Sequence, residues 1–436
     1  MERSWIPERR FHATLEEEAF GATYPSGFRA YVCRKPGFKR RYASYSAFYG
    51  SVDREFAPAA GANVKVPDGI AHYLEHVLFE TPQGNASDIF AARGAYSNAA
   101  TSYTLTSYLF ESTGHFYENL ELLLDFVENP SFPVEKVEKE RGIIEQEIQG
   151  TNDDPHWVGF VGLLENLFER HPIRAHIAGT VASIREISSD LLHECYRAFY
   201  APSNMILCAV GDVDPEEFFD FVARRSKSAR ADGAPPRPPP ARRYPEERPA
   251  AHRSEALKAM DVALPKLFLG FKDVPAPSAG EPYVLQALEV GLALEILFGK
   301  SSPAYQELYE KGLILDDFGA SYHAGAGVGF GLIEGDAPDP ERLRQALLER
   351  IAAAGAQGIP PEDFERSKRN FLGGFIRAFN SLEYIARNYT FYRFHGFDLF
   401  ELVDLVARID REDMERRVRA LLDPEKHAAY LIVPRG

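Results

Sequence analysis

Two histidines and a glutamate lie within five residues of this chain, in an order and spacing that suit a metal site. The segment His72-Tyr73-Leu74-Glu75-His76 has the pattern H-x-x-E-H. If the segment is helical, His72 and His76 are one turn apart on one face, so both imidazoles can bind one metal ion while Glu75 faces the same space. This pattern is typical of zinc hydrolases that invert the commoner H-E-x-x-H order.

An accidental match on a solvated helix face is the plain alternative. The chain has 12 His and 64 Asp and Glu in 436 residues, so roughly 0.05 matches are expected by chance even when Asp is counted as Glu. Ile70, Leu74 and Val77 also make the segment largely apolar, which places the polar side chains in a partly buried setting. Buried charge is costly unless a partner such as a metal ion compensates it. The residues therefore favour a metal site.

Zinc requires a further protein ligand and a position that is open to water. The Glu-rich segment from Pro133 to Gly150 is a predicted helix, with Pro at its start, acidic residues in its first turns and Gly near its end. For most of its glutamates a solvated, charged face is the simpler interpretation. Spacing alone does not choose among four of them, Glu138, Glu140, Glu145 and Glu147.

These two segments together resemble the M16 metallopeptidases, a family that includes pitrilysin, insulin-degrading enzyme and the mitochondrial processing peptidase. Members carry H-x-x-E-H and, some seventy residues later, a glutamate within an E-x-E-R-x-x-I-x-x-E helix. Here that helix runs from Glu138 to Glu147, and Glu147 follows His76 by 71 positions. The segments Gly94 to Ser102 and Phe199 to Met205 also look like family segments, and the single-unit bacterial members are the most similar in length.

The resemblance implies roles for the polar residues. His72, His76 and Glu147 would bind one zinc ion per chain, Glu75 would be the general base, and Glu140 would support the ligands without binding the metal. Zinc lowers the pKa of its bound water toward ~7, and a carboxylate can take that proton and pass it to a leaving amine. A carboxylate can also orient a ligating histidine through its free ring nitrogen, here that of His72 or His76. The predicted activity is a zinc endopeptidase acting on peptides or small unfolded polypeptides.

The length of the chain predicts more than one domain. The clearest boundary is a Pro- and Arg-rich run from Ala234 to Arg243, which favours extended polyproline II structure and indicates a linker. A docking site for a proline-binding module is the alternative interpretation. We expect an N-terminal zinc-bearing domain over residues 1–228, a linker over 229–253, and a C-terminal domain over 254–436.

The two halves look like an internal repeat in which only the first copy carries the metal site. Aligning their long apolar helices places Leu292 opposite His72 and Ile296 opposite His76, and the same alignment places Gly374 opposite the glutamate ligand. In the β-rich segments that open each half, Phe28 to Cys33 is paired with Lys266 to Phe271.

Strands alternate with long helices in each half, which predicts the α+β class, with helices on one face of an antiparallel sheet. The M16 resemblance implies two homologous α/β domains that clasp a chamber. An extended peptide could add as a β-strand to the edge of the sheet near Asn98 to Thr104.

Composition restricts the partners. The formal net charge of −15 argues against general nucleic-acid binding, and a basic peptide is the natural electrostatic complement. The chain opens without a signal-peptide core and has no apolar run of ~18 residues, so we expect a cytoplasmic protein with no membrane segment. Cys33, Cys195 and Cys208 are expected to be ordinary buried residues without disulfides or metal. The Gly-rich run from Ala324 to Gly329 lacks the Lys-Ser/Thr of a phosphate-binding loop.

One departure from the family concerns how the site is completed. Active members add an Arg and a Tyr from the half without zinc or from a partner subunit. The corresponding region here, Asp317 to Ile333, offers Tyr322 as a catalytic candidate but contains no Arg. We therefore expect a heterodimer with a zinc-less homologue first and a homodimer second. A non-catalytic peptide-binding or assembly subunit is the alternative function, although such relatives usually carry damaged zinc motifs.

Overall fold

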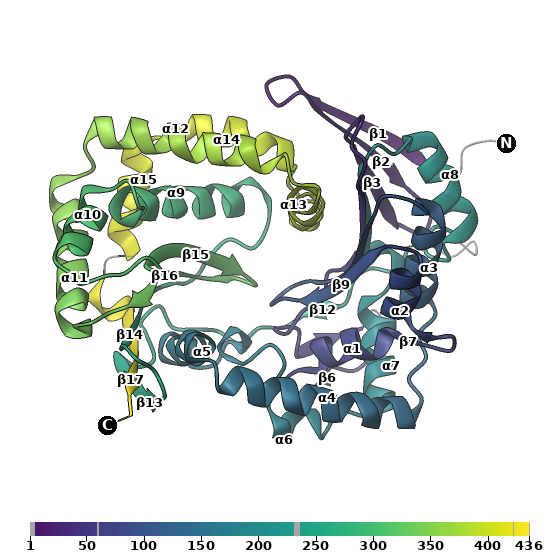
Figure 1. Cartoon of the computed structure of the whole chain (residues 1–436), viewed down its shortest axis with the longest axis horizontal. Coiled ribbons are helices and arrows are strands. Elements are labelled where there is room, and N and C mark those ends of the chain that lie inside the picture. The colour runs from purple at the N-terminus through teal and green to yellow at the C-terminus, as the bar shows by residue number, and fades with distance from the viewer. Residues whose placement is uncertain (1–4, 59–60, 231–235, 422, 436) are drawn as a thin grey trace.

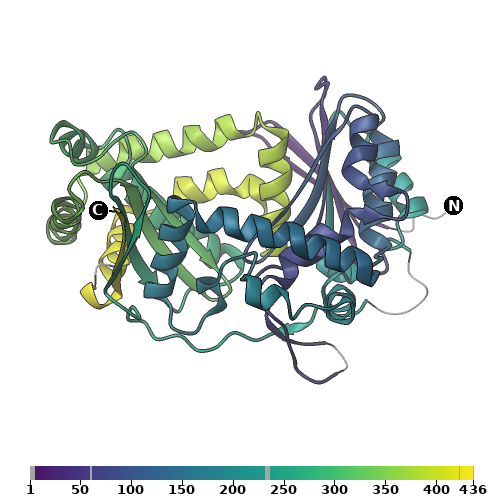
Figure 2. The same cartoon turned by 60° about the horizontal axis from the view of Figure 1, so that its bottom comes forward.

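The fold is described from a computed structural model that covers residues 5–58, 61–230, 236–421 and 423–435. Figure 1 shows two sheet-containing halves side by side, the N-terminal half on the right and the C-terminal half on the left. Figure 2 shows the chain between them running along the outside of the molecule.

The N-terminal sheet has seven strands in the described residues, in the order β1-β2-β3-β11-β4-β10-β9. Their bounds are β1 (Ile6–His12), β2 (Glu17–Thr23), β3 (Arg29–Arg34), β11 (Met205–Gly211), β4 (Arg41–Ala47), β10 (Thr106–Ser112) and β9 (Tyr96–Thr101). β11 runs parallel to β3, and the other neighbours are antiparallel. β9 is an edge strand, and no strand within the described residues pairs with the outer side of its backbone.

The helices of this half alternate with its strands along the chain, and the metal-site segments predicted as helical are α1 and α4. The helices are α1 (Ile70–Leu78), α2 (Ala86–Ala92), α3 (Phe116–Glu128), α4 (Val134–Asn152), α5 (Pro155–Leu167), α6 (Val181–Ile184), α7 (Ser189–Phe199) and α8 (Pro215–Arg225). Short strands pair outside the main sheet: β5 (Glu55–Ala57), β6 (Val64–Lys65), β7 (Glu80–Thr81) and β8 (Gly84–Asn85). Two 3₁₀ turns are η1 (Pro172–Arg174) and η2 (Pro202–Asn204).

The C-terminal sheet has five strands in the described part of the chain, in the order β13-β17-β14-β16-β15. They are β13 (Glu255–Met260), β17 (His427–Pro434), β14 (Lys266–Asp273), β16 (Val328–Asp336) and β15 (Gly319–Gly325). The helices are α9 (Gly280–Phe298), α10 (Pro303–Glu310), α11 (Pro340–Gln357), α12 (Pro361–Ala378), α13 (Leu382–Phe394), α14 (Leu402–Arg408) and α15 (Arg411–Leu421). The 3₁₀ turns are η3 (Leu399–Glu401) and η4 (Pro424–Lys426).

The two sheets have one topology, as the predicted repeat requires. The order β3-β11-β4-β10-β9 matches β13-β17-β14-β16-β15, with the parallel pair in the same place. The counterpart of β3 is therefore β13, and the predicted pairing of Phe28 to Cys33 with Lys266 to Phe271 is wrong by one strand. β13 was not predicted, because it is an exposed edge strand without an apolar pattern. Its Leu257 is 61% exposed.

The predicted arrangement of the sheets needs two corrections. Each sheet contains a parallel pair and is thus mixed, and each is covered on both faces. α5 of the N-terminal half packs on β14 and β17, whereas α13 of the C-terminal half packs on β4 and β11. Every residue of β11 is buried, as expected for a strand that is covered on both faces.

Glycines allow α5 to approach the C-terminal sheet closely. A Cβ atom on Gly159 would overlap the ring of Phe268, and one on Gly162 would overlap the ring of Tyr430. Leu163 and Leu167 of the same helix are fully buried against this sheet. The helix α5 therefore lies in the N-terminal half of the sequence but packs on the sheet of the C-terminal half.

The predicted linker is attached to the protein over the part that the structure describes. Residues 236–253, which we call the strap, include β12 (Ala241–Arg242), which pairs with β5. Arg242 Nε lies 3.0 Å from Asp53 Oδ1, and the Tyr244 hydroxyl donates to the same oxygen at 2.9 Å. Residues 231–235 of the predicted linker lie outside the described residues.

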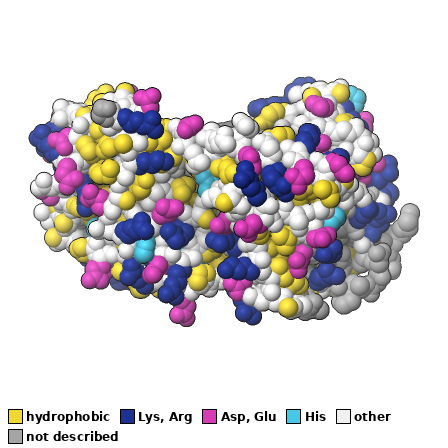
Figure 3. All heavy atoms as spheres, turned by 90° about the horizontal axis from the view of Figure 1, so that it is seen from below, with side chains coloured by type: hydrophobic (Ala, Val, Ile, Leu, Met, Phe, Trp, Pro, Cys, Tyr) yellow, Lys and Arg dark blue, Asp and Glu magenta, His cyan; other side chains and the backbone are white. Residues whose placement is uncertain are grey.

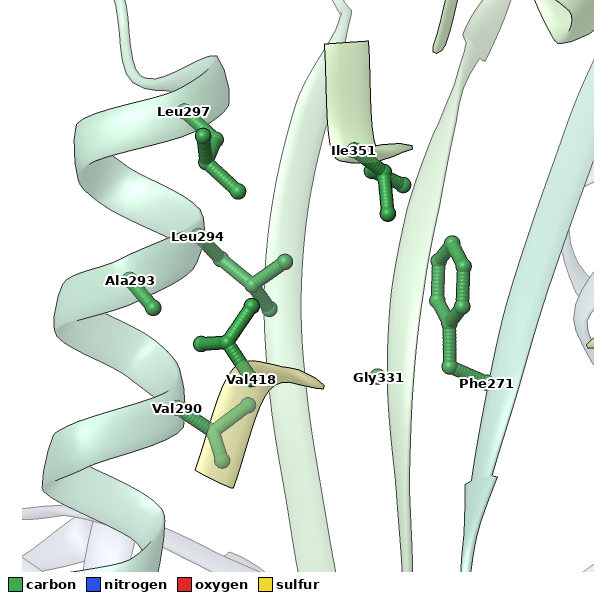
Figure 4. Close-up of a pocket in the computed structure, with 8 residues that line it drawn as sticks. All are labelled: Phe271, Val290, Ala293, Leu294, Leu297, Gly331, Ile351 and Val418. Atoms are coloured by element: carbon green, nitrogen blue, oxygen red, sulfur yellow. The ribbon is translucent and has the colours of Figure 1, made fainter. Parts of the chain in front are cut away.

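Three smaller findings concern the core. Cys33, Cys195 and Cys208 are buried and free, as predicted. The C-terminal core contains a cavity of about 20 Å³, lined by apolar residues and Gly331 (Figure 4), which has the character of a packing defect. No single helix in the described ranges is long and apolar enough to cross a membrane, and α9 with α10 passes such a test only as a pair bent by 43°.

Candidate metal centre

His72 and His76 are placed by α1, which is capped at its start by a glycine. Gly69 caps the helix with a φ of 90°, and a Cβ atom there would collide with the carbonyl of Ala178. The apolar residues of α1 pack in the N-terminal core, which carries the polar side chains inward with them. As a result His72 is only 9% exposed and Glu75 only 8% exposed.

α4 brings a carboxylate to this pair. His72 Nε2 lies 3.4 Å from Glu147 Oε1, and His76 Nε2 lies 3.4 Å from Glu147 Oε2. One potential ligand atom from each of the three residues lies within 4.8 Å of the others. The three predicted ligands, which come from segments 71 residues apart, are thus brought together.

The donor set fits zinc. Two imidazole nitrogens and a carboxylate are a ligand combination that catalytic zinc sites use, with a further position left for water. Both Nε2 atoms face the same carboxylate, and Glu147 is about half exposed, so the cluster is open on one side. A zinc ion would be held by His72, His76 and Glu147.

The ionisable side chains of the centre shift one another's pKa values. Hydrogen bonds to His72 and His76 hold the pKa of Glu147 well below its ordinary value. Burial alone would lower the pKa of His76, but hydrogen bonds to Glu140 and Glu147 outweigh it and raise the pKa to about 9. Burial raises the pKa of Glu75, against the opposing effects of His72 and a hydrogen bond from Thr101.

The sequence left His72 and His76 as possible partners of Glu140, and the structure places Glu140 against His76. Its Oε2 lies 3.3 Å from His76 Nδ1, while His72 Nδ1 is buried with no hydrogen-bond partner in the described residues. The other candidate glutamates of α4 are engaged elsewhere. Glu138 pairs with Arg141, and Glu145 pairs with Arg185.

Thr101 on β9 is a site residue that the sequence did not single out. Its hydroxyl donates to Glu75 Oε2 at 2.5 Å. Side chains alternate along β9: Ala99 packs in the core beside α1, whereas Asn98 and Ala100 line a cavity on the opposite face. The period of two could have placed Thr101 on the α1 face, had the neighbouring helix been known.

His176 lies close to the centre without joining it. Its Nε2 is 3.1 Å from the hydroxyl of Thr151, one turn beyond Glu147 on α4. Burial, with the charge of His72, lowers the pKa of His176 to about 4. This imidazole is therefore a neutral neighbour of the cluster at pH 7.

The hydroxyl of Tyr322 forms its hydrogen bonds with residues of the C-terminal half. It donates to Asp273 Oδ2 at 2.6 Å and accepts from Gln286 Nε2 at 3.0 Å. Burial and the charge of Asp273 raise the pKa of this phenol far above its ordinary value. The described contacts bring Tyr322 to no member of the His72 cluster, because the network on its own sheet already occupies the hydroxyl.

Tyr322 also lines a cavity of about 580 Å³ between the two halves, together with β9, β10, α9 and α13. Arg387 of α13 reaches this cavity, although no Arg occurs between Asp317 and Ile333. The sequence did not single out Arg387, because the Arg was expected in the strand region from Asp317 to Ile333. The exchange of α13 onto the N-terminal sheet was not foreseen.

Comparisons with known proteins agree with this geometry. Residues 61–181 match the sequence profile of insulinase, peptidase family M16, and residues 186–371 match that of the peptidase M16 inactive domain. YmfH of Bacillus subtilis, an uncharacterized zinc protease, is 42% identical over 381 residues, which are 87% of this chain and 88% of that protein.

Solved structures extend the similarity over the whole chain. An M16-like peptidase from Alicyclobacillus acidocaldarius is 31% identical, with a TM-score of 0.90 and 100% of both chains covered. Pitrilysin has a TM-score of 0.75 at 15% identity, and the similarity covers all of this chain and 47% of pitrilysin. At that identity the likeness concerns the fold alone.

Proposed function

The chain belongs to peptidase family M16, and from that premise we propose that it is a zinc endopeptidase that hydrolyses peptides or small unfolded polypeptides. The observation that carries the proposal is the cluster of His72, His76 and Glu147, whose potential ligand atoms lie within 4.8 Å of one another. Glu75, on the same helix, supplies a buried carboxylate beside them.

Each residue has a role that follows from its position. His72 and His76 would hold the metal through their Nε2 atoms, with Glu147 as the third ligand. Zinc supplies Lewis acidity, which makes water a stronger acid and polarises an amide carbonyl. Glu75 takes a proton from the attacking water and passes it to the leaving amine. Thr101 donates to Glu75 Oε2 and so fixes the direction of this base.

Glu140 is a positioning residue. Its carboxylate lies against His76 Nδ1, on the side of the ring away from Glu147. An acceptor there keeps the proton on Nδ1 and leaves Nε2 free to bind a metal, which also makes the imidazole a better ligand. Its near-complete burial, with a 7% exposed side chain, supports this purpose over a solvated role.

The substrate would bind as an added strand. β9 has a free edge, and Thr101 at its end contacts the proposed base. An extended peptide on that edge gains main-chain hydrogen bonds that do not depend on its sequence. Its side chains would alternate between the metal face and the cavity of about 580 Å³.

We also propose that the chain works as a dimer, with a zinc-less homologue as the preferred partner. The engaged hydroxyl of Tyr322 supports this, and neither Tyr322 nor Arg387 has a described contact with the metal cluster. A monomer with full peptidase activity would refute this proposal. The complete donor set argues against the alternative of a non-catalytic subunit, and the cytoplasmic location stays a prediction.

The experiment combines metal analysis with cleavage of a quenched fluorescent peptide library, with and without the candidate partner. Wild type and Glu75→Gln should bind equal amounts of zinc, because Glu75 is not a ligand. Only the wild type should cleave. A Glu75→Gln protein that cleaves as fast as the wild type would refute the assignment of the base.

A further inference from the structure

Basic side chains gather in a cleft where α5, the segment after it and the strap meet. Two cavities of about 700 and 420 Å³ adjoin there and share Arg54 and Arg170 in their walls. We call the combined space the basic cleft. Its basic residues are Arg54, Lys65, Arg170, Arg174, Arg243 and Lys258.

This grouping runs against the composition of the chain. The whole protein has 49 basic and 64 acidic residues, yet the cleft has six basic residues and only Glu55, Asp68 and Glu165 as acidic ones. Figure 3 shows Lys and Arg side chains, with Asp and Glu side chains among them, across the middle of the face seen from below. The cleft is therefore a local positive region on an otherwise acidic molecule.

Most of these basic residues lack a direct ion pair. Arg54 pairs with Asp68 at 2.6 Å. The other five basic residues form no ion pair within the described part of the chain. Four of these five residues are exposed, so water hydrates them, and together they create a positive potential that attracts an anion.

Two buried donors in the same walls also lack acceptors. Arg174 Nε and Trp157 Nε1 are buried, and neither has a hydrogen-bond partner among the residues described. Both residues line the larger cavity. A buried donor without an acceptor costs free energy, and a carboxylate offers two acceptor oxygens together with the matching charge. These two atoms are enclosed in the wall, so the charges of the cleft carry the inference of an anionic ligand.

The basic cleft adjoins the metal centre at His176. This residue lines the larger cavity and contacts Thr151, whose hydroxyl also bonds to the carbonyl oxygen of Glu147. Ile148 and Asn152 of α4 line the cavity as well. A peptide held at the metal centre is therefore close to the cleft.

We propose that the basic cleft is a specificity site that binds acidic side chains of the peptide substrate, an inference that rests on the proposed endopeptidase function. A nucleic acid is a poor alternative, because the net charge of −15 repels a long polyanion beyond the cleft. A peptide with a few acidic residues carries negative charge only where the cations are. The inference reverses the expectation, drawn from composition, of a basic substrate.

The test measures binding separately from cleavage. Glu75→Gln protein is titrated with a labelled peptide that bears clustered glutamates and is acetylated and amidated. The same peptide with glutamines is the neutral comparison, and the glutamine peptide with a free carboxyl terminus separates side chains from the chain end. We expect the glutamate peptide to bind about 10-fold more tightly than the neutral one, with the difference shrinking at high salt.

Variants locate the site. Arg170→Gln/Arg174→Gln should remove the preference, whereas Arg369→Gln, at an exposed position on α12, should keep it. Equal binding of the two amidated peptides, or a preference that survives the double substitution, would overturn the proposal. A preference for the free carboxyl terminus alone would do the same. If the glutamate peptide binds selectively but wild type cleaves nothing, the cleft assignment stands and the peptidase function fails.

Discussion

Lys272 Nζ lies 2.9 Å from Glu247 Oε1, and the two side chains are 0% and 2% exposed. Glu247 belongs to the strap and Lys272 to β14, so the pair joins the strap to the C-terminal sheet. Glu247 also accepts hydrogen bonds from the backbone N–H groups of Glu169, Arg170 and His171. One carboxylate therefore ties three separate segments together.

We expect Glu247→Gln to lower the free energy of unfolding by about 2–4 kcal/mol, because it leaves the Lys272 ammonium buried without a counter-charge. Burial already lowers the pKa of Lys272, a sign that desolvation offsets part of the gain from pairing. Urea unfolding measures the change. Glu246→Gln, at the exposed neighbouring position, is the matched control and should stay within ~0.5 kcal/mol of wild type.

The same pair predicts a pH dependence. Burial would raise the pKa of Glu247, but Lys272 and the three backbone N–H groups lower it to about 2. Because the folded pKa is below the ordinary value of ~4.3, the carboxylate stabilises the fold above that pH and loses this effect as the pH falls toward 2. The stability difference between wild type and Glu247→Gln should shrink across that window. A constant difference would contradict the assignment.

Glu140→Gln should weaken zinc binding about 10- to 100-fold without removing a ligand, because His76 loses the carboxylate behind its ring. Competition with a chelator of known affinity measures the change. Glu135→Gln, at an exposed position on the same helix, controls for the altered charge of α4. Equal affinities in the two variants would show that Glu140 does not position the ligand.

Thr101→Val should reduce kcat by about 10- to 100-fold, since hydrogen bonds to charged groups contribute about 1.5–3 kcal/mol. Zinc content should stay at the wild-type value, because Thr101 contacts the proposed base and no ligand. Thr101→Ser keeps the hydroxyl and should restore most of the rate. Failure of the serine variant to recover activity would point to packing in place of the hydrogen bond.

Tyr322→Phe separates a catalytic from a structural role for the tyrosine. Its hydroxyl is bound to Asp273 and Gln286, so we expect a loss of about 1–2 kcal/mol in stability and only a small change in kcat. Thermal unfolding and steady-state kinetics on one preparation test both. A large fall in kcat at unchanged stability would support the catalytic role that the family resemblance implies.

Gly159→Ala should destabilise the protein by about 1–3 kcal/mol, because the added methyl group overlaps the ring of Phe268. Gly373→Ala, in the middle of α12 with open space around it, should instead stabilise by about 0.5–1 kcal/mol. Chemical denaturation of the two variants gives shifts of opposite sign if α5 is packed tightly on the C-terminal sheet.

The sequence alone could predict which residues of the candidate site approach one another locally. His72, Glu75 and His76 share one helical turn, so their approach needed only the period of the helix. The family, confirmed by the comparisons, also implied the glutamate that α4 now places beside them. Thr101 was missed because its role depends on which helix covers β9, and a single sequence does not contain that pairing.

The fold was predicted in outline and failed where the halves meet. The α+β class and the repeat followed from apolar patterns along each half. The burial of the second face of each sheet was not predicted. The uninterrupted apolar run of β11 is nevertheless the pattern of a strand that is buried on both sides. The strap was expected to be an extended linker because proline favours polyproline II structure, yet an extended segment can still be fixed by side chains such as Arg242.

The exchange of α5 and α13 means that neither copy of the repeat is complete by itself. A copy released from the chain would keep its strands but lose the helix that shields one face of its sheet. Two copies could recover that helix only by associating. The polypeptide therefore contains its own dimer interface, and the absence of the metal ligands from the second copy leaves that interface untouched.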